Sequence, residues 1–318
     1  MTTDTPPLSQ IAAQIADLTA SRAHDIRRRT PEVRVARVLS TQTPNTLHSS
    51  RTTELSMHLE KVEPARKRIV LGMWQQLPIP KISRYLAQLG WDWIILDLQH
   101  GSMNFETAYE CIHTIRTSGS KPFVRVPIGG FSEIEKLLDL GAQGIILPMV
   151  LSPEEAKRAA RAAKYPPLGG RSKGGDAQYL YGDDYPERAN QETLLLVQIE
   201  HIDAANAVED ILSIKGVDGC FVGPTDLALS MGLPRTNFEN DPKHRAAIQR
   251  TLDVCRALGK IPACNTYSLE EAREKARQGY ECITMESDVD LFISAARGLL
   301  AGLREKVEEV SVAPVGKP

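Results

Sequence analysis

The sequence lacks the features that would place it in a membrane or on nucleic acid. No apolar run approaches the roughly 20 residues that span a bilayer, so we expect no membrane contact. Neither charge is in excess, because the net charge is -2 at pH 7 and both signs are interspersed. A chain without a basic face is not expected to bind nucleic acid. These absences favour a protein that acts on small molecules.

Cysteine is also scarce, and no C-x-x-C pair occurs. The five cysteines fall inside predicted helices and strands, at Cys111, Cys220, Cys255, Cys264 and Cys282. A disulfide framework or a zinc cluster needs cysteines in characteristic spacings, so neither is expected here. We therefore expect a reducing, cytoplasmic location.

A chain of 318 residues can form one large α/β barrel or two modest domains. Residues 1–66 differ from the rest in being rich in proline, serine, threonine and arginine, with one helix predicted at 8–27. They contain no apolar segment typical of a signal peptide, and their acidic residues argue against a transit peptide. We expect 1–66 to be a partly helical or disordered extension, followed by a barrel domain at 67–310 and a tail at 311–318.

From residue 69 onward, short apolar runs alternate with segments of helical periodicity. Eight runs occur, at 69–74, 91–98, 121–127, 143–149, 193–200, 217–223, 260–265 and 280–286. Eight strands separated by helices favour a (β/α)8 TIM barrel over a doubly wound sheet. In that fold the chemistry gathers at the carboxyl ends of the strands, so the residues that end these runs are the candidates for a site.

Two carboxylates follow neighbouring strands in this pattern. Glu200 ends the fifth run, and Asp226 follows the sixth. Adjacent strands lie roughly 4.8 Å apart, so the two side chains can hold one hard cation and leave positions for water and substrate oxygens. The alternative is that each carboxylate only caps the helix or turn that follows it.

Other strand ends add polar groups to the same mouth. The residues at the ends of the first, second, third and fifth runs are Trp74, Asp97 with His100, Arg125, and Gln198. Each of them alone has a plain explanation as a core residue, a cap, a loop residue or part of a surface ion pair. Their joint position at one end of a barrel favours a functional site.

These groups indicate chemistry on a 2-oxo acid. A divalent cation held by carboxylates (Mg, Mn or Co) can chelate such an acid and lower the cost of forming an enolate. Arg125 would stabilise the enolate oxygen, and His100 would transfer a proton because imidazole titrates near neutrality. Asp139, at the end of the helix after the third run, is the candidate partner that fixes the His100 tautomer. The set is suited to an aldol or retro-aldol reaction.

Five motifs stand at these positions, in the order GWDWIILDLQH, VRVP, LLDLGAQGIILPMV, LVQIE and GPTDLALSMG. Together they resemble the HpcH/HpaI family of metal-dependent class II pyruvate aldolases, which includes 4-hydroxy-2-oxoheptanedioate and 2-keto-3-deoxyrhamnonate aldolases. Macrophomate synthase is a related member. The resemblance covers about residues 69 to 306. It implies a barrel of the phosphoenolpyruvate/pyruvate-binding type.

The resemblance also implies a role for each residue that matches a motif. The metal ligands would be Glu200 and Asp226, with Asp97 contacting metal-bound water and His100 acting as the base set by Asp139. The substrate-binding residues would be Arg125, Gln198, Trp74, Pro224 and Thr225. The substrates would be pyruvate or oxaloacetate together with an aldehyde or another acceptor.

Three departures from the family pattern concern the second substrate. Gln99 stands where the family has a glutamate, Ser172 follows Arg171 in place of glycine, and Glu286 closes the eighth run where a small or apolar residue is expected. A decarboxylase of oxaloacetate, or a synthase that uses the same enolate to form citrate or a macrophomate-type product, is therefore the alternative function. A binding protein without catalysis is a third reading, which the complete set of site residues disfavours.

Two other mechanisms find no support in the sequence. A Schiff-base aldolase needs a lysine inside the barrel mouth, whereas Lys121 and Lys260 open their strands. A phosphorylated substrate favours glycine-rich turns after the seventh and eighth strands, and these turns read NTYS and ESDVD. We expect a carboxylic acid substrate without phosphate.

Two further segments carry expectations. The segment 165–192 is rich in glycine and tyrosine, and we expect a lid over the site of its own chain or of a neighbouring subunit. The last predicted helix, 288–306, has more apolar surface than one barrel flank needs. Because related proteins exchange this helix between subunits, the resemblance implies a homo-oligomer, a hexamer or otherwise a dimer.

Overall fold

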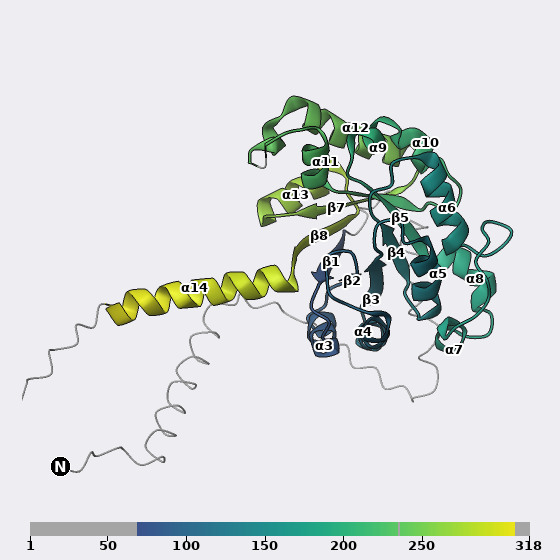
Figure 1. The fold of residues 1–318 in the computed structure, drawn as a ribbon, viewed down its shortest axis with the longest axis horizontal. Helices are drawn as coiled ribbons and strands as arrows, with labels where there is room; N and C mark the ends of the chain where they lie inside the picture. Colours follow the sequence, from purple (N-terminus) through teal and green to yellow (C-terminus); the bar gives the residue numbers. More distant parts are fainter. Residues whose placement is uncertain (1–68, 235, 309–318) are drawn as a thin grey trace, which may run out of the picture. The chain divides into compact units, whose positions relative to one another are not determined.

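The computed structural model describes residues 69–234 and 236–308, which form a closed barrel of eight parallel strands in sequence order (Figure 1). The strands are β1 (Val70–Gln75), β2 (Trp93–Asp97), β3 (Lys121–Arg125), β4 (Gly144–Leu147), β5 (Leu194–Ile199), β6 (Gly219–Val222), β7 (Ile261–Thr266) and β8 (Cys282–Ser287). The predicted fold class is confirmed, and each strand lies within two residues of its predicted ends. The predicted extension at 1–66, its helix at 8–27 and the tail at 311–318 lie outside the described residues.

Helices connect the strands and cover the outside of the barrel, except α14, which projects away from it (Figure 1). They are α3 (Pro80–Gln88), α4 (Phe105–Thr117), α5 (Phe131–Asp139), α6 (Pro153–Ala163), α7 (Ala177–Tyr181), α8 (Tyr185–Glu192), α9 (Ile202–Asn206), α10 (Val208–Leu212), α11 (Pro224–Ser230), the 3-10 turn η1 (Phe238–Asn240), α12 (Pro242–Ala257), α13 (Leu269–Gln278) and α14 (Asp288–Glu308). Local sequence explains several of their starts. Ser152 and Ser268 each accept a hydrogen bond from the backbone N–H of a glutamate three residues later, at the first turns of α6 and α13.

The strands are buried on both faces, which explains their almost continuous apolar sequence. One apolar cluster fills the space between strands and helices, and a smaller one fills the barrel interior. Large rings in the interior pack over glycines of the next strand. A Cβ at Gly144 would lie 2.0 Å from the Phe123 ring, so only glycine fits there.

The direction of the chain places the segment 165–192 at the end of the barrel opposite its mouth. The segment joins the end of α6 to the start of β5, and α6 runs back from the carboxyl end of β4. Two of its tyrosines, Tyr165 and Tyr185, pack around Arg171, whose guanidinium lies 4.6 Å from the centre of the Tyr165 ring. The expectation of a lid over the site of the same chain is therefore wrong, because the segment packs beside the end of α5 and the start of β4, where Tyr181 donates to the carbonyl of Gly141.

Helix α14 begins against the ends of β1 and β8, and its side chains from residue 290 to residue 307 are exposed. The exposed side chains include seven large apolar ones, namely Leu291, Phe292, Ile293, Leu299, Leu300, Leu303 and Val307. Among the described residues, no helix is long and apolar enough to cross a membrane.

Candidate active site at the mouth of the barrel

A cavity of about 640 Å³ opens at the carboxyl ends of the strands. Its polar lining comes from most strands of the barrel and includes Gln76, Arg125, Gln198, Thr225, Asp226, Asn265, Tyr267 and Glu286. Among the residues that the structure describes, no lysine lines this cavity. Lys121 is the first residue of β3, at the opposite end of the barrel, as expected. The mouth therefore offers no lysine for a Schiff base.

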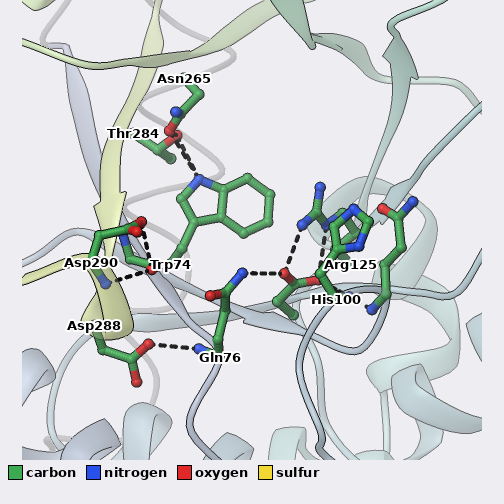
Figure 2. A network of polar contacts seen from close by, with 11 residues as sticks. Trp74, Gln76, His100, Arg125, Asn265, Thr284, Asp288 and Asp290 are labelled. Carbon is green, nitrogen blue, oxygen red and sulfur yellow. Dashed lines mark hydrogen bonds and ion pairs between the residues drawn. The ribbon is translucent and has the colours of Figure 1, made fainter. Parts of the chain in front are cut away.

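A buried ion pair between Asp97 and Arg125 forms the floor of the site. The end of β2 pairs with the end of β3, which sets these two residues side by side. Arg125 donates from Nε to Oδ1 at 2.9 Å and from Nη2 to Oδ2 at 2.6 Å. Gln76 donates a further hydrogen bond to Oδ2 at 3.0 Å (Figure 2). Because two of the three guanidinium nitrogens are held in this way, Nη1 of Arg125 is left for a ligand in the cavity.

The carboxylate of Asp97 is fully engaged by protein groups. Besides Arg125 and Gln76, the backbone N–H groups of Gln99 and His100 donate to Oδ1 at 3.1 and 3.2 Å. Burial alone would raise the pKa of Asp97, but the hydrogen bonds and the charge of Arg125 bring it below its ordinary value. The Asp97 side chain is 0% exposed. It thus orients Arg125 and the turn at His100, and its expected contact with metal-bound water stays a prediction.

Trp74 supports the same arginine from the other side (Figure 2). Its ring lies 4.5 Å from the Arg125 guanidinium, a cation–π contact that favours a fixed position for both. The indole N–H donates to Oδ1 of Asn265 at 3.1 Å and to Oγ1 of Thr284 at 3.0 Å. Trp74 is therefore a rigid wall of the cavity, which agrees with its expected place in substrate binding.

Glu200 and Asp226 lie close together beside Gly223. Glu200 follows β5, and a Cβ at Gly223 would lie 2.6 Å from its Oε2. Oε1 accepts a hydrogen bond from the backbone N–H of Met149 at 2.8 Å, and Met149 has a φ of 52°. Burial raises the pKa of Glu200 to about 7, and the negative charge of Asp226 contributes in the same direction. A positive charge between the two carboxylates would relieve both effects.

The groups around this pair are suited to a hard divalent cation. Oε1 of Gln198 is buried and has no hydrogen-bond partner within the described part of the chain. Two carboxylates and an amide oxygen are the oxygen ligands that Mg²⁺ and Mn²⁺ prefer. No group of three or more His, Cys, Asp or Glu side chains is assembled for a metal in the described residues. A cation here would therefore keep coordination positions for substrate and water.

Pro224 and Thr225 start α11 at the edge of the cavity and hold Asp226 in its first turn. The carbonyl of Pro224 lies 2.8 Å from Nε2 of the buried His244. The hydroxyl of Thr225 lies 3.0 Å from that of Tyr267, which follows the neighbouring strand β7. These contacts fix the short turn that carries the candidate ligand Asp226.

His100 and Asp139 do not meet within one chain. His100 follows β2 at the mouth, and its exposed ring has no hydrogen-bond partner among the described residues. Asp139 ends α5, which runs back toward the start of β4, so it lies at the opposite end of the barrel. There Oδ1 of Asp139 accepts from Nη2 of Arg171 at 2.8 Å. The expected dyad is not formed in this chain, and only a second protomer could supply an Asp139 to His100.

Comparison with known proteins identifies the family of this chain. Residues 70–295 match the family described as HpcH/HpaI aldolase/citrate lyase. The chain belongs to this family. The hydroxypyruvate/pyruvate aldolase of Rhizorhabdus wittichii is 36% identical over 238 residues, which are 74% of this chain and 95% of that protein. The chain is accordingly an enzyme of the aldolase type, as the sequence motifs indicate.

Two further relatives show the range of the HpcH/HpaI family. The 4-hydroxy-2-oxo-heptane-1,7-dioate aldolase of Shigella flexneri is 32% identical over 73% of this chain and 87% of its own. Among solved structures, the citrate synthase SbnG has a TM-score of 0.71 at 26% identity, and the match covers 81% of this chain and 98% of that one. The same barrel fold thus occurs in a relative named as a synthase, and relatives named as aldolases share its sequence.

Several residues of this HpcH/HpaI site were not predicted from the sequence. Gln76 holds Asp97, and its own backbone N–H donates to Oδ1 of Asp288 at 2.8 Å (Figure 2). Asn265 and Tyr267, at the end of β7, bond to Trp74 and Thr225. Gln76 and Asn265 could have been found, because each lies at or directly after a strand end. The part of Asp288 has no comparable signal, since it depends on the path of the chain after β8.

We predict that Glu200 destabilises the metal-free protein as the pH rises. The native state keeps a proton on Glu200 up to about pH 7, whereas the unfolded chain releases it near the ordinary value of 4.5. Between these values the native state binds more protons, so its stability falls with increasing pH. With EDTA present, the melting temperature should fall more between pH 4.5 and 7 in the wild type than in Glu200→Gln.

The control for this measurement is Glu187→Gln, because Glu187 is exposed on α8 at the opposite end of the barrel. It should show the pH dependence of the wild type. Parallel melting curves for the wild type and Glu200→Gln would contradict the assigned shift.

Proposed function

We propose that this chain is a divalent-metal-dependent carbon–carbon lyase that cleaves and forms a 4-hydroxy-2-oxo acid through the enolate of pyruvate. The observation that carries the proposal is that Asp226 and Arg125 line one cavity without a lysine among the described residues, and that the charges of both act on the buried carboxylate of Glu200. Anionic oxygen ligands beside a guanidinium suit a substrate with adjacent carboxylate and keto groups. The names of the aldolase relatives support the same reaction class.

Glu200 and Asp226 would hold the cation, which we take to be Mg, Mn or Co. The buried and unpartnered Oε1 of Gln198 supports this assignment, because it lies in the same mouth without a donor. A divalent cation in this place supplies Lewis acidity toward the keto oxygen of the 2-oxo acid. The protein must then bind the acid, stabilise the enolate and move one proton.

Arg125 is the residue that stabilises the enolate oxygen in this proposal. Its Nε and Nη2 are fixed by Asp97 and its face lies against Trp74. The N–H groups of Nη1 are therefore held in one orientation. A donor held in place before the reaction stabilises developing negative charge without reorganising. Gln198, Pro224 and Thr225 complete the wall on the side of Asp226 and position the acid.

His100 would carry the proton of the acceptor hydroxyl. Its backbone is held by Asp97, while its ring is exposed at the mouth and free to meet a ligand or a water molecule. Imidazole titrates near neutrality, so it can accept the proton in cleavage and return it in synthesis. If the Asp139 of another protomer reaches this ring, it would fix the tautomer.

A second candidate function uses the same enolate differently. Gln99 and Glu286 depart from the expected pattern near the mouth, and the citrate synthase SbnG shares the barrel at 26% identity. An oxaloacetate decarboxylase or an enolate-using synthase would need the cation and Arg125, but not proton transfer by His100. All five cysteines are free and buried, which supports the cytoplasmic location that we propose.

We also propose that α14 docks on a second copy of this chain. Its seven exposed large apolar side chains have no counterpart on the outer helices of the barrel, and such a stripe needs a partner surface. An exchanged helix buries its stripe on the partner barrel and forms an interface of the obligate type. A hexamer built from such dimers, or the dimer alone, is the expected assembly.

Metal dependence is the first prediction of this proposal. Glu200→Gln and Asp226→Asn should each abolish tight Mn²⁺ binding in calorimetric titration, because each removes an anionic ligand. Excess EDTA should abolish pyruvate-forming activity in the wild type. Asp210→Asn, on the exposed start of α10, is the control and should bind Mn²⁺ normally. Full activity in excess EDTA would refute metal dependence.

Proton transfer by His100 is the second prediction. His100→Ala should lower aldol cleavage by about 100-fold or more, whereas oxaloacetate decarboxylation should decline much less, because that reaction needs no proton from an acceptor hydroxyl. The measurement compares both rates in the same enzyme preparation, with His113→Ala on α4 as a control. Equal loss of both activities would assign His100 to binding or folding.

Assembly through α14 is the third prediction. Light scattering at micromolar concentration should give a hexamer or a dimer of the 35.1 kDa chain. Leu299→Asp with Leu303→Asp should shift the mass toward the monomer, because charges cannot be buried without partners, while methionine at both positions should preserve the assembly. A monomeric wild type would refute helix exchange, and a dimer would remove only the hexamer.

A further inference from the structure

The end of β8 contains a β-bulge, and Glu286 lies in it. Gly72 of β1 pairs with Thr284, but Trp74 pairs with Ser287, so two residues of β8 face Met73 alone. Glu286 has a φ of 51°, in the left-handed region that residues with a Cβ rarely adopt. Bulges of this kind redirect a side chain and are frequent beside active sites.

The strained backbone of Glu286 is unusual within the described part of this chain. Only three residues other than glycine have positive φ there, namely Met149, Asn237 and Glu286. Asparagine tolerates this conformation well, and Met149 donates its N–H to Glu200 in the site. Glu286 is thus the second strained position at the mouth, and strain at such positions is typical of function.

The Glu286 side chain lines the mouth cavity and has no hydrogen-bond or ion-pair partner among the described residues. Two of its neighbours in the lining, Asp290 and Tyr267, are already engaged, and among the described residues no ion pair joins Glu286 to Arg297, which lines the same cavity. Asp290 accepts from the hydroxyl of Ser287 at 2.7 Å, and the hydroxyl of Tyr267 pairs with Thr225. A partly buried carboxylate without a donor favours a ligand that brings one.

Trp74 lines the cavity and contacts both Arg125 and Asn265 (Figure 2). Arg125 lies against one side of its ring, together with the groups proposed to bind the 2-oxo acid. Asn265 accepts from the indole N–H at the edge of the ring, and Asn265 and Glu286 reach the cavity from β7 and β8, whereas Arg125 reaches it from β3. Glu286 lies at the end of β8, which is separated from β3 by β1 and β2 and from β6 by β7, so we assign it to the second substrate and not to the 2-oxo acid.

We propose that Glu286 determines which acceptor aldehyde the enzyme uses. Its carboxylate accepts a hydrogen bond from the hydroxyl group of a hydroxyaldehyde and repels an acceptor that carries a carboxylate of its own. Glu286 is a specificity-determining residue, since it takes no part in forming the enolate. This inference rests on the proposed function, because it concerns the second substrate of the same reaction.

The test compares three acceptors with pyruvate as the donor. Glycolaldehyde carries a hydroxyl, propanal replaces that hydroxyl with a methyl group, and succinate semialdehyde carries a carboxylate. In the wild type, kcat/KM should be about tenfold or more higher for glycolaldehyde than for propanal, as expected for a hydrogen bond to a charged group. Glu286→Gln should reduce this ratio about tenfold and raise the relative use of succinate semialdehyde.

Two further variants keep the test decisive. Glu187→Gln makes the same change of charge at the opposite end of the barrel and should keep the wild-type ratios. Glu286→Gly relieves the positive φ, so it should lose the preference for glycolaldehyde while its melting temperature rises. A loss of selectivity together with higher stability cannot result from misfolding.

The outcomes separate this inference from the proposed function. If the wild type forms no enolate, seen as absence of metal-dependent oxaloacetate decarboxylation, the proposed function fails. If the enolate forms but the acceptor ratios are the same in the wild type and Glu286→Gln, only the role of Glu286 is overturned. A wild-type preference for succinate semialdehyde would also overturn it, and would assign acceptor binding to Arg297, the cation of α14 that lines the cavity.

Discussion

The site depends on the buried ion pair between Asp97 and Arg125. Two charges in a barrel interior lose their hydration, and the loss is offset only if each finds well-placed partners. Asp97 receives five hydrogen bonds, from two nitrogens of Arg125, from Gln76 and from two backbone N–H groups. Removal of one partner from such a pair typically costs about 3–5 kcal/mol. The arginine that lines the cavity is therefore held by the same contacts that join the ends of β2 and β3.

The parallel barrel explains how much of this could be predicted from the sequence. Strand ends meet at one mouth, so Trp74, Arg125, Gln198 and Asp226 could be placed together from their order alone, and the structure brings them to one cavity. The same reasoning applies in reverse to Asp139. A residue at the end of the helix after a strand lies at the opposite end of the barrel. The motif match suggested a role for Asp139 at the mouth and did not take this chain direction into account.

Other features could not be predicted, because they depend on contacts between distant segments. Side-chain packing leaves the amide oxygen of Gln198 without a hydrogen-bond donor and gives Asp97 its bonds to Arg125. The spacing of residues in the sequence does not encode either feature. The bulge at Glu286 follows from a shift of register between the first and last strands as the barrel closes. Its only signal in the sequence was a glutamate where a small or apolar residue was expected.

The mouth of the barrel has one part around Arg125 and another around the end of β8. The side chains of the first part are held more tightly, and this difference helps to explain how one family supports several reactions. The part around Arg125 is fixed by a buried ion pair, a stacked tryptophan and the turn at Pro224. The other part is formed by a bulge and by the first turns of α14, where side chains are more exposed. Substitutions there leave the ion pair intact, so in the reaction that we propose the acceptor can change while enolate formation is retained. A barrel with this division accommodates aldolases and synthases without a change in its core.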